Sequence, residues 1–426
     1  MTTTSLETLS NSRTPGLLDA RRQDELDPLS NIGDLFDLPP DLVYLDGNSL
    51  GAMPAVVPEK IQEAVTEGWR TGLIRSWNDR DWHILPLTLG DRLAPLMGAN
   101  AGEVLVVDST SINLFKTLSA ALELRPDRTE IVSERYNFPS DLHIIQGAIT
   151  HFYPQHRLVE GKESDDSIVE LIGPSTAVVT LTQVSYRTGL IRDMERITKE
   201  AHRAGALVIW DLAHTLGAVP VDLNVANVDF AVGCTYKYLN AGPGGPAYLF
   251  VADRHITDAF NPLTGWQAHA DPFSFDTHFK PASNIDKFRC GTPGVLSYIA
   301  LESSLDIFEM VDMEAIRTKS KRLTTLFVDL VESLCENYPL QLASPRDSSQ
   351  RGSQVSFSHA EGWPIMQALI AHGVIGDFRA PNLLRFGFAP LYTRYEDVWL
   401  AASMLAHILQ TECWKDPVYA APKLVT

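Results

Sequence analysis

The middle of the chain alternates between short apolar runs and segments with helical spacing. Residues 177–184 and 206–210 are rich in apolar and β-branched side chains, as expected of strands that are buried on both faces. Residues 193–204 have helical spacing and are followed by Gly205, a helix stop signal. The same patterns predict strands at 104–107, 230–236 and 246–251 and a helix at 111–122. This alternation predicts an α/β fold with a mainly parallel sheet.

From about residue 303 the spacing of the apolar residues changes. It predicts one long helix at 304–334, with an apolar face made by Leu323, Phe327, Leu330, Val331 and Leu334. Further predicted elements are strands at 354–358 and 383–388 and helices at 364–371 and 396–409. These elements predict a smaller α+β domain. We therefore expect an N-terminal segment that joins the small domain (1–55), a large ligand-binding domain (56–303) and a small C-terminal domain (304–426).

Composition narrows the class of protein. The 426 residues are 45% apolar and 21% charged, which is typical of a globular protein, and the formal net charge of −18 argues against nucleic-acid or anionic-membrane partners. No apolar stretch approaches the ~20 residues of a membrane span. Residues 1–5 show no secretory signal, and Cys234, Cys290, Cys335 and Cys413 lack the spacing of a zinc site. We therefore expect a cytoplasmic protein with reduced thiols and no metal.

Two residues at the ends of predicted strands indicate a specific chemistry. Asp211 follows the apolar run 206–210, and Lys237 follows the strand 230–236 and precedes a glycine-rich turn. Open α/β sheets bind ligands at the carboxyl ends of their strands. A lysine with apolar neighbours loses hydration, which favours its uncharged, nucleophilic form. A lysine paired with an aspartate is typical of pyridoxal phosphate (PLP) sites. The plainer alternatives are that Asp211 caps a loop with His214 packed nearby, and that Lys237 is a solvated surface group.

Three further segments carry candidate binding residues, each with a plainer alternative. Thr110 and Ser111 lie at a predicted helix start, where hydroxyls and free N–H groups bind an anion or simply cap the helix. Phe138 lies in a turn-like segment, where its ring stacks on an aromatic cofactor or anchors the loop. Arg385 lies in an apolar run, where it clamps a substrate carboxylate or faces solvent.

Taken together, these segments resemble the kynureninase family of PLP enzymes, which has the aspartate aminotransferase fold (fold type I). The matching segments are residues 45–51, 111–114, 138–141, 186–189, 211–214, 236–240, 265–266 and 385–392. They span most of the chain, and their order and number make the match specific. The resemblance implies a large PLP-binding domain with a seven-stranded, mainly parallel sheet and a smaller α+β C-terminal domain.

The resemblance also implies a role for each candidate residue. Lys237 would bind the cofactor covalently and move protons, Asp211 would pair with the pyridine nitrogen, and Arg385 would bind the substrate α-carboxylate. The other implied cofactor contacts are stacking by Phe138, support of Asp211 by His214, phosphate binding by Thr110, Ser111 and Tyr236, and nearby positions for Asp141 and Thr182. Trp266 and Thr292 would reach the phosphate region of the neighbouring subunit, which implies a homodimer with shared active sites.

The implied reaction is hydrolysis of the Cβ–Cγ bond of L-kynurenine to anthranilate and L-alanine, within tryptophan catabolism and NAD biosynthesis. Tyr236 is the candidate acid/base for the later proton transfers. 3-Hydroxykynurenine is a further candidate substrate. Some family members that prefer it carry Asn where this chain has Thr292, so the resemblance favours unsubstituted L-kynurenine here.

Other functions of the same fold are alternatives. A cysteine desulfurase needs a nucleophilic cysteine near the carboxylate-binding arginine, and residues 373–392 contain none. A small aminotransferase would accept keto acids and would release no anthranilate. A non-catalytic relative would be expected to lack Lys237, Asp211 or Arg385, all of which are present.

Overall fold

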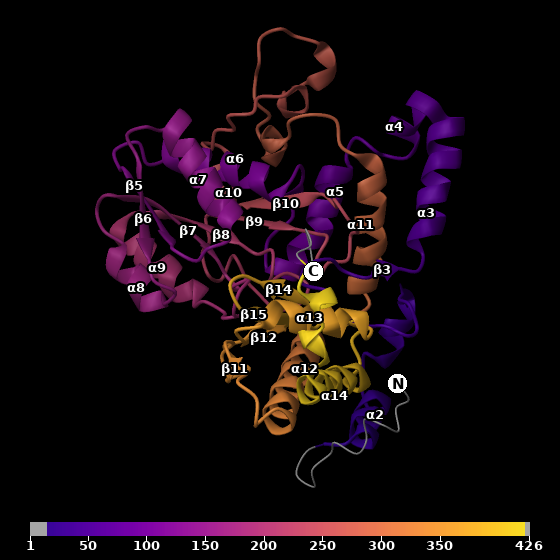
Figure 1. Ribbon diagram of the computed structural model, residues 1–426. Helices are drawn as coiled ribbons and strands as arrows, with labels where there is room; N and C mark the ends of the chain where they lie inside the picture. The colour runs from indigo at the N-terminus through magenta and orange to yellow at the C-terminus, as the bar shows by residue number, and fades with distance from the viewer. Residues whose placement is uncertain (1–14, 422–426) are drawn as a thin grey trace.

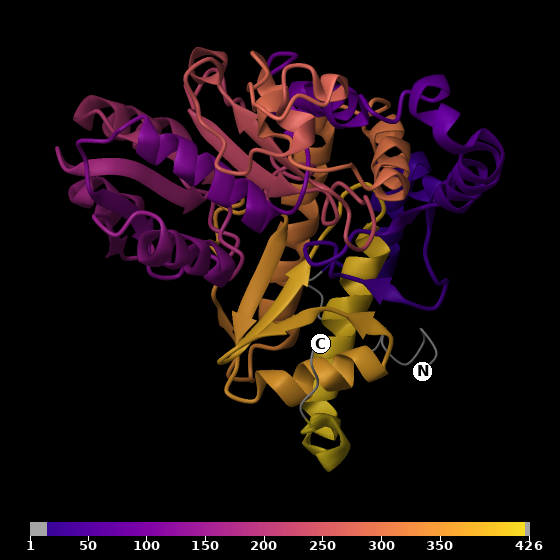
Figure 2. The same ribbon diagram turned by 90° about the horizontal axis from the view of Figure 1, so that it is seen from above.

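The structure, a computed structural model, describes residues 15–421. Two sheets organise the chain: a seven-stranded sheet formed between residues 104 and 251, and a four-stranded sheet formed between residues 341 and 387. Figures 1 and 2 show the C-terminal elements, coloured orange to yellow, gathered on one side of the large sheet. No helix in the described residues is both long and apolar enough to cross a membrane. Residues 1–5, where the sequence shows no secretory signal, lie outside the described residues.

The large sheet has the strand order β4-β10-β9-β8-β7-β5-β6. Its strands are β4 (Val104–Val106), β5 (Glu130–Glu134), β6 (Arg157–Gly161), β7 (Thr176–Thr182), β8 (Leu207–Asp211), β9 (Phe230–Cys234) and β10 (Ala247–Val251). Strands β5 to β9 are parallel, and β10 is antiparallel to β4 and β9. The register pairs Thr182 with Asp211 and Asp211 with Val232, so the carboxyl ends of β7, β8 and β9 lie at one edge. The predicted mainly parallel sheet is confirmed.

Helices cover both faces of this sheet, which explains the continuously apolar strands. Val178 and Leu207 pack with helices α6 (Thr110–Glu123) and α7 (Pro139–His151). Their chain neighbours Val179 and Val208 pack on the opposite face. That face is covered by α5 (Leu85–Leu93), α8 (Asp165–Leu171), α9 (Met194–Ala204) and α11 (Val295–Phe308). Because successive strand residues point to opposite faces, both faces require apolar side chains.

Helix boundaries coincide with capping residues. The Asp193 side chain accepts a hydrogen bond from the Arg196 N–H at the start of α9, and Gly205 ends the helix with a φ of 82°. Ser109 caps α6 in the same way, by accepting a hydrogen bond from the Ile112 N–H at 3.4 Å. Only local contacts are needed for these stops and starts, so the sequence reveals them.

The predicted single helix at 304–334 is wrong. The chain instead forms α11 (Val295–Phe308) and α12 (Met313–Leu334). The side chain of Asp312 accepts a hydrogen bond from the Glu314 N–H at 3.1 Å, which caps a new helix start. The predicted apolar face is correct for α12, where Leu323, Phe327, Leu330 and Val331 are buried and Leu334 is partly buried. Helix α11 packs into the core of the large sheet and runs across residue 303, so the division at residues 55 and 303 stays a prediction.

The smaller sheet has the order β11-β12-β15-β14 and packs against α12, α13 and α14. Its elements are β11 (Gln341–Leu342), β12 (Gln354–Ser358), α13 (Gly362–Ala371), β14 (Asp377–Arg379), β15 (Leu383–Gly387) and α14 (Tyr395–Thr411). These bounds confirm the two strands and two helices predicted here. Helix α2 (Leu17–Glu25) lies beside α14, because the Asp24 carboxylate accepts hydrogen bonds from the N–H groups of Tyr395 and Glu396 at 2.7 and 3.0 Å.

The remaining elements surround these two cores. They are β1 (Phe36–Asp37), β2 (Val43–Tyr44), β3 (Met53–Pro54), α3 (Val57–Glu63), α4 (Ser76–Asp79), α10 (Asp253–Ile256) and β13 (Val374–Ile375). Strand β2 pairs in parallel with β13, which joins the N-terminal segment to the C-terminal part. The segment between α10 and α11 projects from the body at the top of Figure 1.

Candidate active site

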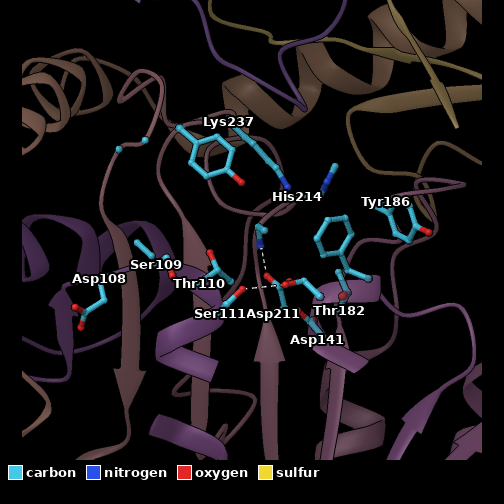
Figure 3. Close-up of a pocket in the computed structure, with 17 residues that line it drawn as sticks. Asp108, Ser109, Thr110, Ser111, Asp141, Thr182, Tyr186, Asp211, His214 and Lys237 are labelled. Atoms are coloured by element: carbon cyan, nitrogen blue, oxygen red, sulfur yellow. Dashed lines mark hydrogen bonds between the residues drawn. The ribbon is translucent and has the colours of Figure 1, made fainter. Parts of the chain in front are cut away.

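A cavity of about 280 Å³ lies at the carboxyl ends of the central strands (Figure 3). Most of the residues predicted from the sequence line it: Thr110, Ser111, Phe138, Asp141, Thr182, Asp211, His214, Tyr236 and Lys237. The strands β7, β8 and β9 end at this edge. The residues that line the cavity come from many parts of the chain, from Asp108 to Ala247. Trp266, Thr292 and Arg385 are not among the residues that line the cavity.

One end of the cavity suits an anion. The first turns of α6 and α7 meet there, joined by a 2.9 Å hydrogen bond between the hydroxyls of Ser111 and Ser140 (Figure 3). Free N–H groups and the positive end of the helix dipole favour an anion at a helix start. Gly244, with a φ of 70°, and Gly245 also line this cavity. The hydroxyls of Thr110 and Ser111 add neutral donors to the same wall.

Lys237 and Asp211 face the same cavity from neighbouring strand ends. Lys237 is 9% exposed, and its Nζ lies 5.7 and 5.8 Å from the ring centroids of Phe138 and Tyr236. Asp211 is 5% exposed, and its Oδ1 accepts a hydrogen bond from the Ala213 N–H at 2.7 Å. The neighbours of the lysine are therefore aromatic rings together with a carboxylate, rather than apolar groups alone.

Asp141 and Asp211 form a buried carboxyl pair with unequal environments. Burial raises the pKa of Asp141 well above its ordinary value, and the charge of Asp211 raises it further. Burial also raises the pKa of Asp211, but the charge of Lys237 and the Ala213 N–H act in the opposite direction. Burial thus favours the protonated form of both carboxyls, and Lys237 together with the Ala213 N–H favours the anionic form of Asp211.

The remaining residues of the cavity wall are held by short contacts. The Thr182 hydroxyl donates its proton to Asn137 Oδ1 at 2.5 Å, so it can only accept a hydrogen bond from a ligand. The Phe138 ring packs edge to face on Tyr186, with 5.2 Å between the centroids. The charge of Cys234 and burial raise the pKa of Tyr236, so its phenol stays protonated at neutral pH.

Arg385 lies beside the cavity in a buried cluster of charges. It is 1% exposed, so the solvent-facing alternative is wrong. Its Nε donates to Asp377 Oδ1 at 2.6 Å, and its Nη2 contacts the other oxygen of the same carboxylate. Its Nη1 donates to the carbonyl oxygen of Tyr186 at 2.8 Å, and its Nη2 donates to the Ser49 hydroxyl at 2.9 Å. The planar fork is thus held rigidly next to a residue of the cavity wall.

A second carboxyl of this cluster, that of Asp46, has a pKa close to neutral pH. Burial and the charge of Asp377 raise the pKa of Asp46 to about 7, while Arg385, Ser49 and Arg379 act in the opposite direction. Arg379 also contacts Asp377. Below about pH 7 the cluster therefore contains two guanidinium groups and one carboxylate, and it carries a net positive charge suited to an anionic ligand.

Trp266 and Thr292 belong to the projecting segment and its base. Trp266 is 44% exposed. Thr292 lines a neighbouring cavity, whose wall shares Asp108 and Gly244 with the first cavity. That both residues contact a second subunit stays a prediction.

Two features of the site were missed by sequence reasoning. Asp377 faces Arg385 across the antiparallel strands β14 and β15, and only their register reveals this pair. Tyr186 was noted as part of a matching segment, but its place in the cavity wall was not predicted. The eight-residue spacing of Asp377 and Arg385 around a turn is a signal that could have suggested the pair.

Comparisons with known proteins agree with this geometry. A family model described as the kynureninase C-terminal domain matches residues 316–405. Kynureninase from Burkholderia pseudomallei (strain K96243) is 51% identical over 407 residues, which cover 95% of this chain and 98% of that protein. Kynureninase from Pseudomonas fluorescens is 45% identical with the same coverage.

Solved structures are similar in fold at low sequence identity. An apo cysteine desulfurase from Thermococcus onnurineus NA1 has a TM-score of 0.75 and 20% identity, and the match covers 94% of this chain and 100% of that chain. The cysteine desulfurase CsdA from Escherichia coli has a TM-score of 0.74 and 19% identity, and the match covers 90% of this chain and 98% of that chain. These structures confirm the predicted fold class. Because the two kynureninases match over nearly the whole chain, the chain belongs to the kynureninase family.

Proposed function

We propose that this chain hydrolyses the Cβ–Cγ bond of L-kynurenine to give anthranilate and L-alanine, with PLP as its cofactor. The observation that carries the proposal is the cavity that brings Lys237 and Asp211 together with an anion-binding end, beside the buried fork of Arg385. It occurs in a chain about half identical, over nearly its full length, to a protein named kynureninase.

The residues present fit PLP. The first turns of α6 and α7, with the hydroxyls of Thr110 and Ser111, would hold the phosphate. Asp211 would hold a proton on the pyridine nitrogen, the Phe138 ring would cover one face of the pyridine, and Lys237 would bind the aldehyde. When bound, PLP supplies an electron sink for the carbanion that forms at the substrate α-carbon.

The chain's own residues supply positioning and proton transfer. Arg385 would hold the substrate α-carboxylate, which fixes the α-carbon relative to Lys237. The Lys237 amine, whose residue is 9% exposed, would remove the α-proton. Tyr236, whose phenol stays protonated at neutral pH, would donate a proton during the later steps.

The test is to add L-kynurenine to the PLP-loaded protein and to follow fluorescent anthranilate together with alanine. We expect the two products in a 1:1 ratio without a keto-acid acceptor. A requirement for a keto acid would identify an aminotransferase, and sulfide release from cysteine would identify a desulfurase. If no anthranilate forms under saturating PLP, the proposed reaction is wrong although the fold stands.

Several finer proposals accompany this function. Thr292 supports a preference for L-kynurenine over 3-hydroxykynurenine, and the two values of kcat/KM measure it directly. We also propose a cytoplasmic homodimer in tryptophan catabolism and NAD biosynthesis, in which Trp266 and Thr292 contact the partner's cofactor. The exposure of Trp266 on the projecting segment supports this assembly. Acidic partners such as nucleic acid are disfavoured by the net charge of −18.

The raised pKa of Asp46 predicts a pH-dependent affinity for substrate. Below about pH 7 Asp46 is neutral and the cluster around Arg385 is positive, whereas above this pH the ionised carboxylate cancels the charge. We therefore expect KM for L-kynurenine to rise as the pH increases through 7. Asp46→Asn should remove this rise, because it keeps the shape of the side chain without its ionisation. Steady-state kinetics between pH 6 and 8.5, estimated to bracket this pKa, provide the measurement.

The same ionisation of Asp46 should also lower the stability of the fold as the pH rises. The ordinary pKa of Asp46 is 3.8, so between about pH 4 and pH 7 the folded state binds more protons than the unfolded state. The free energy of unfolding therefore falls as the pH rises through this window, and Asp46→Asn should flatten that fall. Asp41→Asn, at an exposed position nearby, is the control and should leave both profiles unchanged. A wild-type KM that is constant across pH 7 would contradict the assignment.

A further inference from the structure

A buried amide joins the smaller sheet to the wall of the cavity. Gln354 lies in β12 and is 1% exposed. Its Nε2 donates hydrogen bonds to the main-chain carbonyl oxygens of Ser185 and Tyr186, at 3.3 and 3.0 Å. Because a carbonyl oxygen can only accept, these two bonds fix which end of the amide is nitrogen. The side-chain oxygen Oε1 must therefore point in the other direction.

On that other side, Oε1 of Gln354 lies 3.2 Å from Nδ1 of His214. An amide oxygen only accepts hydrogen bonds, so His214 Nδ1 must carry a proton. Asn48 does not alter this result. In one orientation its amide nitrogen donates to the same oxygen at 3.2 Å. In the swapped orientation it donates to Asp46 and accepts from Arg385, but its oxygen then lies 3.2 Å from Gln354 Oε1. Two acceptor oxygens repel each other, so the Gln354 orientation that the two carbonyls fix favours the first Asn48 orientation.

The second nitrogen of His214 is left with a lone pair. His214 is 3% exposed, and burial together with the charges of Lys237, Arg385 and Arg379 lowers the pKa of His214 well below its ordinary value. A neutral imidazole that is protonated on Nδ1 is an acceptor at Nε2. His214 lines the cavity, and within residues 15–421 no group forms a hydrogen bond with its Nε2.

We infer that Gln354 is a positioning residue, which holds His214 in the Nδ1–H tautomer so that Nε2 offers a lone pair to a hydrogen-bond donor of the bound ligand. The Tyr186 carbonyl that receives the Gln354 amide also accepts from Arg385 Nη1 at 2.8 Å. The Gln354 side chain thus sets the tautomer of His214. Through the Tyr186 carbonyl it is also linked to Arg385. The inference does not depend on which reaction the site catalyses.

The tautomer can be read directly by ¹⁵N NMR of protein labelled at histidine, with His214→Gln used to identify the His214 signals. In the wild-type protein we expect a protonated Nδ1 and a lone-pair Nε2 between pH 6 and pH 8, an estimated range around the ordinary histidine pKa. Spectra of the protein alone, with PLP, and with PLP plus L-alanine identify the donor. A shift of the Nε2 signal on adding PLP assigns the donor to the cofactor, and a shift only with L-alanine assigns it to the amino acid.

Matched variants separate positioning from general stability. Gln354→Leu removes the acceptor, so we expect the His214 signals to lose the Nδ1–H pattern. Gln354→Glu retains an acceptor and should preserve protonation of Nδ1. The control is Ser356→Ala on the same strand, because the Ser356 hydroxyl bonds the neighbouring carbonyl of Arg187 at 2.6 Å without contacting His214. This variant should leave the His214 signals unchanged.

The wild-type spectrum alone can overturn the inference, even if Gln354→Leu does not fold. A His214 protonated on Nε2, or on both nitrogens, would contradict it. So would an equal change of the His214 signals in Ser356→Ala and Gln354→Leu. A PLP-loaded protein that releases no anthranilate but shows the Nδ1–H pattern would contradict the proposed reaction and would still support this inference.

Discussion

Lys237→Ala is expected to lower kcat for anthranilate release by at least about three orders of magnitude. General acid–base catalysis alone is typically worth about 10²–10⁴-fold, and the covalent bond to the cofactor adds to it. No neighbouring amine replaces Lys237 among the residues that line the cavity, since it is the lysine of that wall. Turnover of L-kynurenine at saturating PLP measures the effect.

The position of the covalent bond gives an independent check on the same variant. Borohydride reduction of the wild-type holoprotein should label the peptide that contains Lys237, and Lys237→Ala should remain unlabelled there. Lys199→Ala, at an exposed position of α9, is the control and should retain wild-type turnover and labelling. Labelling of a different lysine, or near-normal turnover by Lys237→Ala, would refute its role.

Arg385→Lys is expected to lower kcat/KM for L-kynurenine by roughly 10²–10³-fold, mainly through a higher KM. Lysine keeps the charge but lacks the planar fork with which Arg385 contacts Asp377 and reaches Ser49 and Tyr186. Hydrogen bonds to charged groups contribute about 1.5–3 kcal/mol each, so the loss of one or two accounts for this factor. Steady-state kinetics with L-kynurenine measure the change.

Arg351→Lys separates this effect from the cost of disturbing any buried arginine. Arg351 is also 1% exposed, but it bonds the carbonyl oxygens of Pro345 and Arg346, away from the cavity. Both variants should lose stability in thermal unfolding, and only Arg385→Lys should raise KM. If the two variants raise KM equally, Arg385 does not bind the substrate carboxylate.

The location of the site followed from sequence because it depends on local signals. Asp211 and Lys237 each follow a short apolar strand, and parallel strands place their carboxyl ends at one edge. Thr110 and Ser111 were recognised because a helix start shows itself in neighbouring residues. The break between α11 and α12 was missed because Asp312 favours both a helix start and a surface position within a longer helix.

The contacts between distant residues that orient Arg385 and His214 could not be predicted from local sequence patterns. Asp377 and Arg385 pair through the register of two strands, and His214 meets Gln354 across 140 positions of the chain. A one-residue change of register would turn these side chains to the opposite face of the sheet. The short spacing of Asp377 and Arg385 around a turn suggests that they can pair, but no local pattern indicates the contact between His214 and Gln354.

By itself, the sequence determined which segments are buried, where most strands and helices begin and end, and which residue types gather at one sheet edge. These properties depend on the polarity and spacing of near neighbours. Only the tertiary structure decided that the pKa of Asp46 is raised to about 7, that burial raises the pKa of Asp141 and that burial lowers the pKa of His214. Protonation depends on desolvation and on charges a few ångströms away in space, and the groups that supply them come from distant parts of the chain.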